Sequence, residues 1–176
     1  YLTGHDSESQ QLLTICLDAV TGNELWQKGK TLPSIPKTHV ANSPASPTVA
    51  SDGKHIYVYF GLTGLDCLDL DGNVVWSKKL PSPHNPHGAG SSPLVVGSRL
   101  FLVVDQGELF RPMGSHLLCL DKATGDQLWR AERPLSSPGW STPVFWNDTV
   151  VVLGRRLIAY DPQTGKEKWW LVLCQA

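Results

Sequence analysis

Hydrophobic residues occur in short runs along this chain, and each run is closed by turn-forming residues. Leu12–Leu17, Ile56–Phe60 and Leu100–Val104 are examples, each followed or preceded by Asp, Asn or Gly. Short apolar runs bounded in this way are typical of β-strands. The 3.6-residue periodicity of amphipathic helices is absent from the sequence. The pattern therefore predicts an all-β chain.

One motif recurs four times, at residues 17–26, 120–129 and 160–169 and, in a shortened copy, at 68–76. In every copy the glycine precedes the tryptophan by the same four positions. An internal repeat of this kind decides the fold before any single residue does. The predicted structural residues of the repeat are Asp18, Gly22, Trp26, Asp71, Gly72, Trp76, Asp121, Gly125, Trp129, Asp161, Gly165 and Trp169.

The residue types of this motif suit a tight turn between two strands. An aspartate side chain accepts hydrogen bonds from backbone N–H groups two residues further on, and threonine adds a weaker bond. Glycine supplies a positive φ without a Cβ clash. The tryptophan falls on the second strand, where a large ring covers the next unit. We predict that these four tryptophans hold neighbouring units together and do not bind ligands.

The tryptophans are 50, 53 and 40 residues apart, which fits four short strands per unit, as in a propeller blade of about 40–50 residues. A Ser-Pro or Thr-Pro pair opens three units, at Pro47, Pro93 and Pro143. The fold class is therefore an all-β propeller segment of about three and a half blades with an incomplete ring. Residues 1–176 form one partial domain, with approximate blades at 1–32 (half, its first two strands missing), 43–80, 91–133 and 140–174.

Composition narrows the range of functions. The 15 Lys and Arg residues and the 16 Asp and Glu residues give a net charge of 15 − 16 = −1. No basic stripe indicates nucleic acid binding. No apolar run approaches the ~20 residues of a membrane-spanning helix. The first residues, 1–11, lack the order of a signal peptide. Because free blade edges and faces favour association, we expect the missing blades of the same propeller as partners, and poor monodispersity of this segment on size-exclusion chromatography.

The cysteines follow the repeat. Cys16, Cys67 and Cys119 each lie two residues before a repeat aspartate, and Ala159 holds this place in the fourth copy. A position that takes cysteine or alanine is a small, buried strand position. There is no C-x-x-C pair, which argues against structural zinc.

The Asp-x-x-Thr-Gly-x-x-x-Trp turns and the Ser/Thr-Pro strand openings resemble the pyrroloquinoline-quinone-type (PQQ-like) propeller repeat. The segments His39–Pro47 and His87–Pro93 look like those of uncharacterised PQQ-like repeat proteins of environmental bacteria. Members of this family include quinoprotein dehydrogenases, a scaffolding lipoprotein of outer-membrane assembly and kinase sensor domains. The resemblance implies a periplasmic or extracellular, bacterial protein, and fixes the fold better than the activity.

Two functions stay open at this stage. In the dehydrogenases of the family, PQQ lies in the central funnel against an adjacent Cys-Cys disulfide, with calcium and an aspartate base. The present sequence has no adjacent cysteine pair and no evident cofactor motif. We expect a non-catalytic binding or scaffold module, and the alternative is part of a PQQ-dependent dehydrogenase that binds quinone and calcium.

Candidate ligand-binding residues precede the inner strands, where a propeller presents the mouth of its funnel. They are His39, Asn42, His84, His87 and Trp140, with Asn85 nearby. Imidazole serves as a metal ligand or an acid–base group near neutral pH. The structural alternative is that these side chains cap backbone groups in proline-rich crossings. No third metal ligand accompanies His84 and His87, so we predict no metal site and no catalytic residue, and a protein or small-molecule ligand bound by the loops.

Two further pairs of polar residues lie at strand ends. Asp105-Gln106 ends one predicted strand, and Arg155-Arg156 follows another. Either pair could face the rim of the funnel. We expect both to be solvated at the surface.

Overall fold

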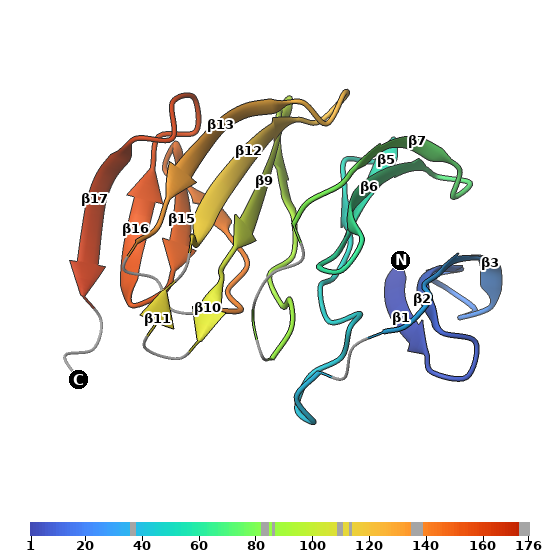
Figure 1. Cartoon of the computed structure of the whole chain (residues 1–176). Helices are drawn as coiled ribbons and strands as arrows, with labels where there is room; N and C mark the ends of the chain where they lie inside the picture. Colours follow the sequence, from blue (N-terminus) through green and yellow to red (C-terminus); the bar gives the residue numbers. More distant parts are fainter. Residues whose placement is uncertain are drawn as a thin grey trace.

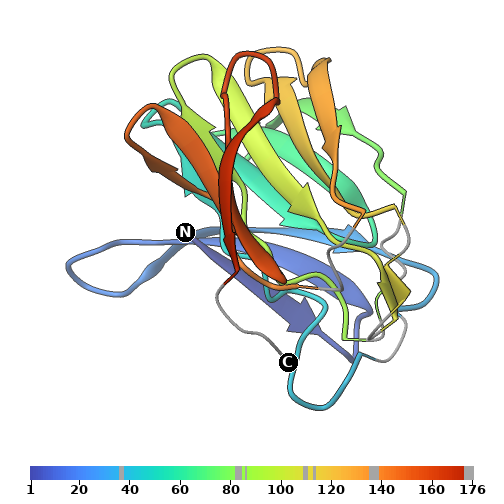
Figure 2. The same cartoon turned by 90° about the vertical axis from the view of Figure 1, so that its left-hand side faces the viewer.

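The computed structural model describes residues 1–35, 38–81, 85, 87–108, 111–112, 114–134 and 139–172. These residues form four antiparallel sheets and one small hairpin. The sheets follow one another in chain order, from the blue N-terminal sheet to the red C-terminal sheet (Figure 1). Figure 2 looks onto the C-terminal end of this row, with the fourth sheet nearest the viewer.

Each sheet is a simple meander in which consecutive strands are neighbours. The first sheet contains β1 (Leu2–Asp6), β2 (Gln11–Leu17) and β3 (Glu24–Thr31). The second contains β4 (Ala50–Ser51), β5 (His55–Phe60), β6 (Gly64–Asp69) and β7 (Val74–Lys78). The third contains β8 (Leu94–Val96), β9 (Arg99–Val104), β12 (His116–Asp121) and β13 (Gln127–Glu132). The fourth contains β14 (Val144–Trp146), β15 (Thr149–Leu153), β16 (Arg156–Tyr160) and β17 (Glu167–Val172).

The structure confirms the predicted fold class and corrects one detail of the first blade. The first sheet has three strands, because residues 2–6 form a complete strand paired with β2; the expectation that two strands of this blade are missing was wrong. Between β9 and β12 the chain forms a short hairpin of β10 (Gly107–Glu108) and β11 (Arg111–Pro112).

The core lies between neighbouring sheets, in three layers. Tyr57, Leu102 and Leu118 belong to the layer between the second and third sheets. Strands β5, β6, β9 and β12 are buried along nearly their whole length, because a sheet covers each of their faces. In β2 every second residue is buried, as expected of a strand with a covered face on one side only.

The repeat turns are built as the sequence predicts. The Asp18 carboxylate accepts hydrogen bonds from the backbone N–H groups of Val20 (3.0 Å) and Thr21 (2.7 Å), and these bonds lower the pKa of Asp18. Asp121 and Asp161 accept the corresponding backbone hydrogen bonds in their own turns. In the shortened copy the accepting carboxylate is Asp69, and Asp71 donates its own N–H to it (3.0 Å). The structural role assigned to Asp71 therefore belongs to Asp69.

A β-bulge lies in the strand after each repeat turn, at the residue directly before the tryptophan. The register shifts between residues 16 and 17, 67 and 68, 119 and 120, and 159 and 160. In each case the tryptophan pairs with the residue before the shift, so that Cys16 lies opposite Trp26 and Ala159 opposite Trp169. A bulge of this kind increases the local twist and re-aims the side chains that follow.

The three cysteines in the described part of the chain are buried, unpaired strand residues. Burial raises the pKa of Cys67 to about 11 and that of Cys119 to about 12. A thiol that stays protonated is a poor nucleophile and metal ligand. The burial of Cys16, Cys67 and Cys119 confirms the small, buried strand position predicted for them, and Cys174 lies outside the described residues.

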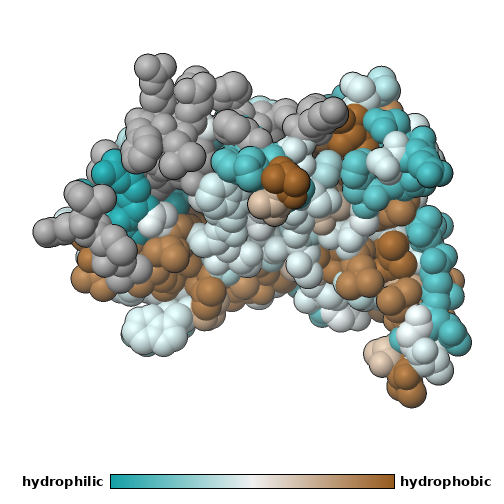
Figure 3. Space-filling view, turned by 90° about the horizontal axis from the view of Figure 1, so that it is seen from below, coloured by the Kyte–Doolittle hydropathy of each residue, from teal (hydrophilic) through white to brown (hydrophobic). Residues whose placement is uncertain are grey.

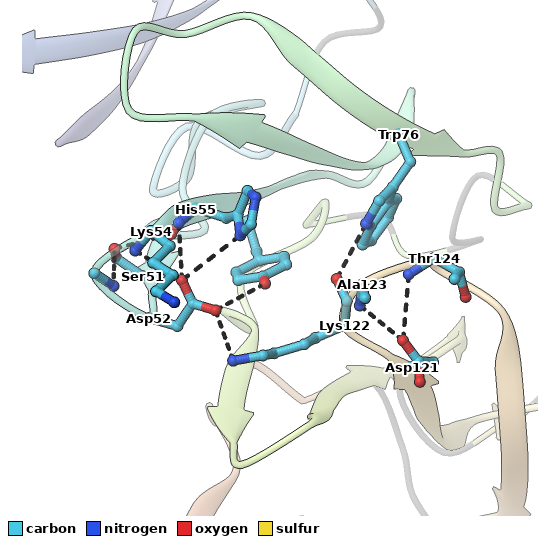
Figure 4. A network of polar contacts seen from close by, with 11 residues as sticks. Ser51, Asp52, Lys54, His55, Trp76, Asp121, Lys122, Ala123 and Thr124 are labelled. Carbon is cyan, nitrogen blue, oxygen red and sulfur yellow. Dashed lines mark hydrogen bonds and ion pairs between the residues drawn. The ribbon is translucent and has the colours of Figure 1, made fainter.

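The second and third sheets are joined by a polar network at the end that carries the repeat turns (Figure 4). Lys122 Nζ lies 2.7 Å from Asp52 Oδ2, and Trp76 Nε1 donates to the Lys122 carbonyl (3.1 Å). The same Asp52 carboxylate accepts backbone N–H groups of its own turn, from Lys54 (3.0 Å) and His55 (2.8 Å). The Asp52 carboxylate therefore stabilises the turn between β4 and β5 and also binds Lys122 of the third sheet.

Candidate binding site at the funnel end

The crossings from the last strand of one sheet to the first strand of the next lie at the lower end of Figure 1, opposite the repeat turns. Figure 3 looks onto this end, where pale residues of intermediate hydropathy occupy the centre. Two of these crossings, at residues 38–49 and 87–93, and the segment 139–143 lead into the inner strands. The sequence analysis placed the candidate ligand site here.

Four of the five predicted residues meet around one hollow. It has a volume of about 430 Å³ and is lined by His39, Ala41, Asn42, Ser46, His87, Gly90 and Trp140. These residues come from three successive crossings, so no single sheet forms the site. His84 lies outside the described residues.

Three aromatic rings form the wall of the hollow. The ring centroids of His39 and His87 are 4.4 Å apart with a tilt of 45°. His87 also meets Trp140 edge to face, with centroids 5.3 Å apart. Rings in these arrangements attract one another beyond the area they bury. Trp140 remains 44% exposed, so part of its ring faces solvent.

Asn42 ties two crossings together. Its Nδ2 donates to the backbone carbonyls of His87 and, at 3.4 Å, Ala89. Its Oδ1 accepts from Ser46 Oγ, and its own carbonyl accepts from the Thr38 hydroxyl (3.1 Å). With both ends of its amide engaged, Asn42 positions the wall of the hollow, as the capping alternative anticipated.

Asn85 shapes the turn that presents His87. Its Oδ1 accepts from the His87 N–H (3.0 Å) and its carbonyl accepts from the Gly88 N–H (2.9 Å). Gly88 has a φ of +80°, and Gly90 leaves room for Trp140, because a Cβ at residue 90 would collide with the indole ring. Small residues at these two positions are thus required for the approach of the rings.

The tautomer of His39 follows from its neighbour. The Ala41 backbone N–H donates to His39 Nδ1 (3.2 Å), so the neutral ring carries its proton on Nε2. His39 therefore offers a hydrogen-bond donor rather than a metal-binding lone pair. Within the described ranges no three His, Cys, Asp or Glu side chains cluster as metal ligands.

A second, much smaller cavity lies next to the hollow, and Gly90 lines both. Its volume is about 10 Å³, close to the least that holds one water molecule. Asp105 and Ser91 line it, and both are nearly fully buried. Asp105 Oδ2 and Ser91 Oγ have no hydrogen-bond partner among the residues that the structure describes. The cavity is therefore a small polar pocket beside the aromatic hollow.

The burial of Asp105 corrects the expectation of a solvated rim residue. Asp105 is 5% exposed, and its Oδ1 accepts a hydrogen bond from Arg133 Nε at 3.1 Å. The Arg133 side chain is fully buried as well and reaches Tyr160 Oη and the Leu153 carbonyl, each at 3.5 Å. Burial raises the pKa of Asp105, and the positive charge of Arg133 opposes this rise.

Sequence reasoning did not single out Arg133. It follows β13 and its partner lies 28 residues earlier, so only the packing of strand ends brings the two together. A proline after the arginine was the one local sign of a strand end. The expectation that Arg155 and Arg156 are solvated is confirmed for Arg155, which is exposed. Arg156 is half-buried, and its guanidinium lies 4.2 Å from the centroid of the Trp170 ring.

Successive four-stranded meanders that stack face to face, with a ligand-sized hollow at one end, define a segment of a β-propeller. A family model described as outer membrane protein assembly factor BamB matches residues 10–176, and the chain belongs to this family of PQQ-like repeat proteins.

Solved structures show the same fold at low sequence identity. BamB from Moraxella catarrhalis is 19% identical with a TM-score of 0.59, over 93% of this chain and 46% of that one. A europium-containing methanol dehydrogenase is 16% identical with a TM-score of 0.64, over 97% and 42%. The quinohemoprotein alcohol dehydrogenase from Comamonas testosteroni is 17% identical with a TM-score of 0.62, over 93% and 33%.

The chain thus spans less than half the length of these propeller structures. No curated protein matches it in sequence. No helix in the described part of the chain is long and apolar enough to cross a membrane.

Proposed function

We propose that this chain is a non-catalytic binding or scaffold module of a PQQ-like repeat protein, and that it binds its ligand in the hollow of His39, His87 and Trp140. The observation that carries the proposal is the convergence of three rings from three separate crossings on one hollow of about 430 Å³. Hollows of this size, walled by rings and few polar groups, are typical of small-molecule and peptide-side-chain sites.

The polar groups of the hollow favour binding over catalysis. Asn42 is engaged with backbone carbonyls and Ser46, and the Nδ1 atom of His39 is engaged with Ala41. A nucleophile and a base in mutual hydrogen-bond contact are the usual sign of covalent catalysis. The hollow instead offers ring faces and a donor on His39, which suit a neutral ligand with a flat apolar part.

The family description adds a compartment to the proposal. It names a factor of outer-membrane assembly, and one similar structure is a BamB protein. We therefore place this module in an extracytoplasmic compartment of a bacterium, where a propeller serves as a rigid support for loops. A cell-fractionation experiment on the complete protein tests this placement, and recovery in the cytoplasm contradicts it.

Phenol and benzyl alcohol are simple probes of the hollow. On titration we expect a saturable shift and broadening of the probe's own NMR signals, with dissociation constants in the millimolar range, on the order of −4 kcal/mol for so small a ligand. Trp140→Ala removes binding, and Trp170→Ala, on the fourth sheet, leaves it unchanged. Absence of a saturable change with both probes contradicts the proposed site.

Quinone-dependent catalysis remains the competing function, since two of the similar structures are dehydrogenases. Adding PQQ with calcium to the complete protein and recording its absorbance separates the two. We expect no saturable spectral change. Stoichiometric binding of the quinone would replace the non-catalytic proposal with the enzymatic one.

A further inference from the structure

One carboxylate lies between the second and third sheets at the end that carries the repeat turns. Asp52 Oδ2 is 2.7 Å from Lys122 Nζ (Figure 4). Tyr57 Oη also donates to Asp52 Oδ2, at 3.2 Å. Asp52 belongs to the turn between β4 and β5 of the second sheet, and Lys122 belongs to the repeat turn of the third. The space between these two sheets is therefore occupied by a carboxylate with a hydroxyl and an ammonium group around it.

The third and fourth sheets lack this contact. Phe101 takes the place of the tyrosine, because each of the two pairs across its sheet with the cysteine of the repeat. Pro162 takes the place of the lysine, because each directly follows a repeat aspartate. The turn between β8 and β9 has only two residues, Gly97 and Ser98, and so provides no carboxylate.

A hollow of about 460 Å³ lies at this place between the third and fourth sheets. It is lined by the four residues just named and by Phe145 on β14. Phe145 is 39% exposed, and its cross-strand partner Val150 belongs to the core layer between the two sheets. Cross-strand partners share one face of a sheet, so the Phe145 ring also faces the third sheet. The hollow thus has an accessible aromatic wall, at the end of the molecule opposite the funnel.

Arg99 brings an uncompensated positive charge to the hollow. It lines the hollow and forms no ion pair with any residue that the structure describes. Its Nε atom is buried and has no hydrogen-bond partner among those residues. Asp121 lies opposite Arg99 on β12, but Asp121 Oδ1 accepts backbone N–H groups of its own turn. A half-buried guanidinium in this situation attracts an anion.

Three further charged residues line the hollow. Lys168 Nζ lies 4.0 Å from Asp161 Oδ2, so these two charges oppose each other. Asp148, in the turn between β14 and β15, is exposed. Solvent screens an exposed carboxylate, so Asp148 reduces the attraction of Arg99 for an anion without cancelling it.

We propose that this hollow binds an organic carboxylate with a flat apolar part. The ligand carboxylate accepts hydrogen bonds from the Arg99 guanidinium, and the apolar part lies against Phe145. The ligand thereby supplies the carboxylate that Asp52 supplies at the preceding interface. Arginine suits this role because its planar fork pairs with both oxygens of a carboxylate. The volume of the hollow is that of a small-molecule site.

Phenylacetate and its neutral counterpart phenylacetamide test the proposal. The titrations use Trp140→Ala, so that a ring bound at the funnel end does not contribute. From the ligand's own NMR signals we expect saturable binding of phenylacetate with a dissociation constant in the millimolar range. Phenylacetamide should bind about tenfold more weakly or not at all, because it lacks the charge. Equal affinities for the two compounds, or no saturable binding of phenylacetate, overturn the proposal.

Substitutions at the hollow locate the carboxylate. Arg99→Gln should weaken phenylacetate binding about tenfold or more, whereas Arg155→Gln, at an exposed arginine outside the hollow, should leave it unchanged. Ser98→Asp places a carboxylate of the chain itself beside Arg99 and should also remove binding, whereas Ser98→Asn should not. An unchanged affinity in Arg99→Gln or in Ser98→Asp contradicts the assigned position.

Asp148→Asn gives a change of the opposite sign. Asp148 has a φ of +55°, which asparagine tolerates, so the turn is preserved. Loss of the opposing charge should tighten phenylacetate binding about twofold. Weaker binding in this variant would show that the hollow prefers a cation and would overturn the proposal. Since Ser98 and Asp148 lie in exposed turns, these variants keep the test valid even where Arg99→Gln does not fold.

Discussion

The Arg133 guanidinium donates to the Asp105 carboxylate at 3.1 Å, with both side chains almost completely shielded from solvent. The pair lies beside the small cavity at the funnel end and connects the third sheet to Tyr160 and Leu153 of the fourth. Removal of either partner leaves a buried charge without compensation. The contact between Asp105 and Arg133 therefore stabilises the packing of the third sheet on the fourth and also shapes the small cavity at the funnel end.

Replacement of Arg133 by methionine tests this dependence. We expect a loss of about 3–5 kcal/mol in the free energy of unfolding, measured by urea denaturation at pH 7. Without the guanidinium, burial raises the pKa of Asp105 further, so the variant should lose stability as the pH rises above ~4, the unfolded pKa of aspartate. The double variant Asp105→Leu with Arg133→Met should be more stable than Arg133→Met alone. A loss below 1 kcal/mol in the single variant would show that the pair is not buried in solution.

His116 gives the fold a pH dependence of the opposite sign. Burial lowers the pKa of His116, whose Nδ1 lies 2.8 Å from the Gly114 carbonyl. The unfolded chain therefore binds the proton more readily, so this stability is complete above ~6.5, the unfolded pKa, and is lost as the pH falls. We expect the free energy of unfolding to fall by up to about 1.4 kcal/mol per pH unit below that point. His116→Gln should reduce the slope, and an unchanged slope would contradict this assignment.

The Asp52–Lys122 contact should stabilise the stacking of the second and third sheets. Burial alone raises the pKa of Asp52, but hydrogen bonds from Lys122 and the backbone lower it overall. Lys122→Met should cost about 1 kcal/mol, since the ammonium group is partly solvated, and Asp52→Asn should cost more because the turn is weakened too. Part of this stability should disappear as the pH falls below ~4, the unfolded pKa of aspartate. Thermal unfolding of the two variants measures the difference, and equal costs would contradict the double role of Asp52.

The close contact between a repeat glycine and the tryptophan ring of the neighbouring sheet can be tested by replacing the glycine with alanine. Gly165 and Gly53 have φ values of +71° and +83°, but only a Cβ at Gly165 meets an indole, at 2.6 Å from Trp129 Cε3. Gly53→Ala should cost about 1 kcal/mol for the left-handed backbone alone. Gly165→Ala should cost about 1–3 kcal/mol more, because Trp129 must move. Chemical denaturation gives both values, and a difference near zero would show that the ring is free to shift.

Local chemistry explains which parts of this structure the sequence could predict. The turns at Asp18 and Gly22 depend on residues a few positions apart, and the site residues His39, His87 and Trp140 share a place in the repeat. The burial of Asp105 could not be predicted, because it depends on an arginine 28 residues away. The cysteine spacing points to Asp69, but the structural role was assigned to Asp71 because the shortened copy lacks one residue before its glycine.

The bulge after each repeat turn limits how the hairpins of these sheets can vary in length. Residues between the aspartate and the glycine number three in most copies and two in the copy at 69–72, so this part of the turn accepts a deletion. Beyond the glycine the distance to the tryptophan never changes, because the bulged residue directly before the tryptophan sets which face the ring takes. One residue more there would reverse the indole and separate the sheet from its neighbour. Insertions that preserve the fold must therefore enter upstream of the glycine.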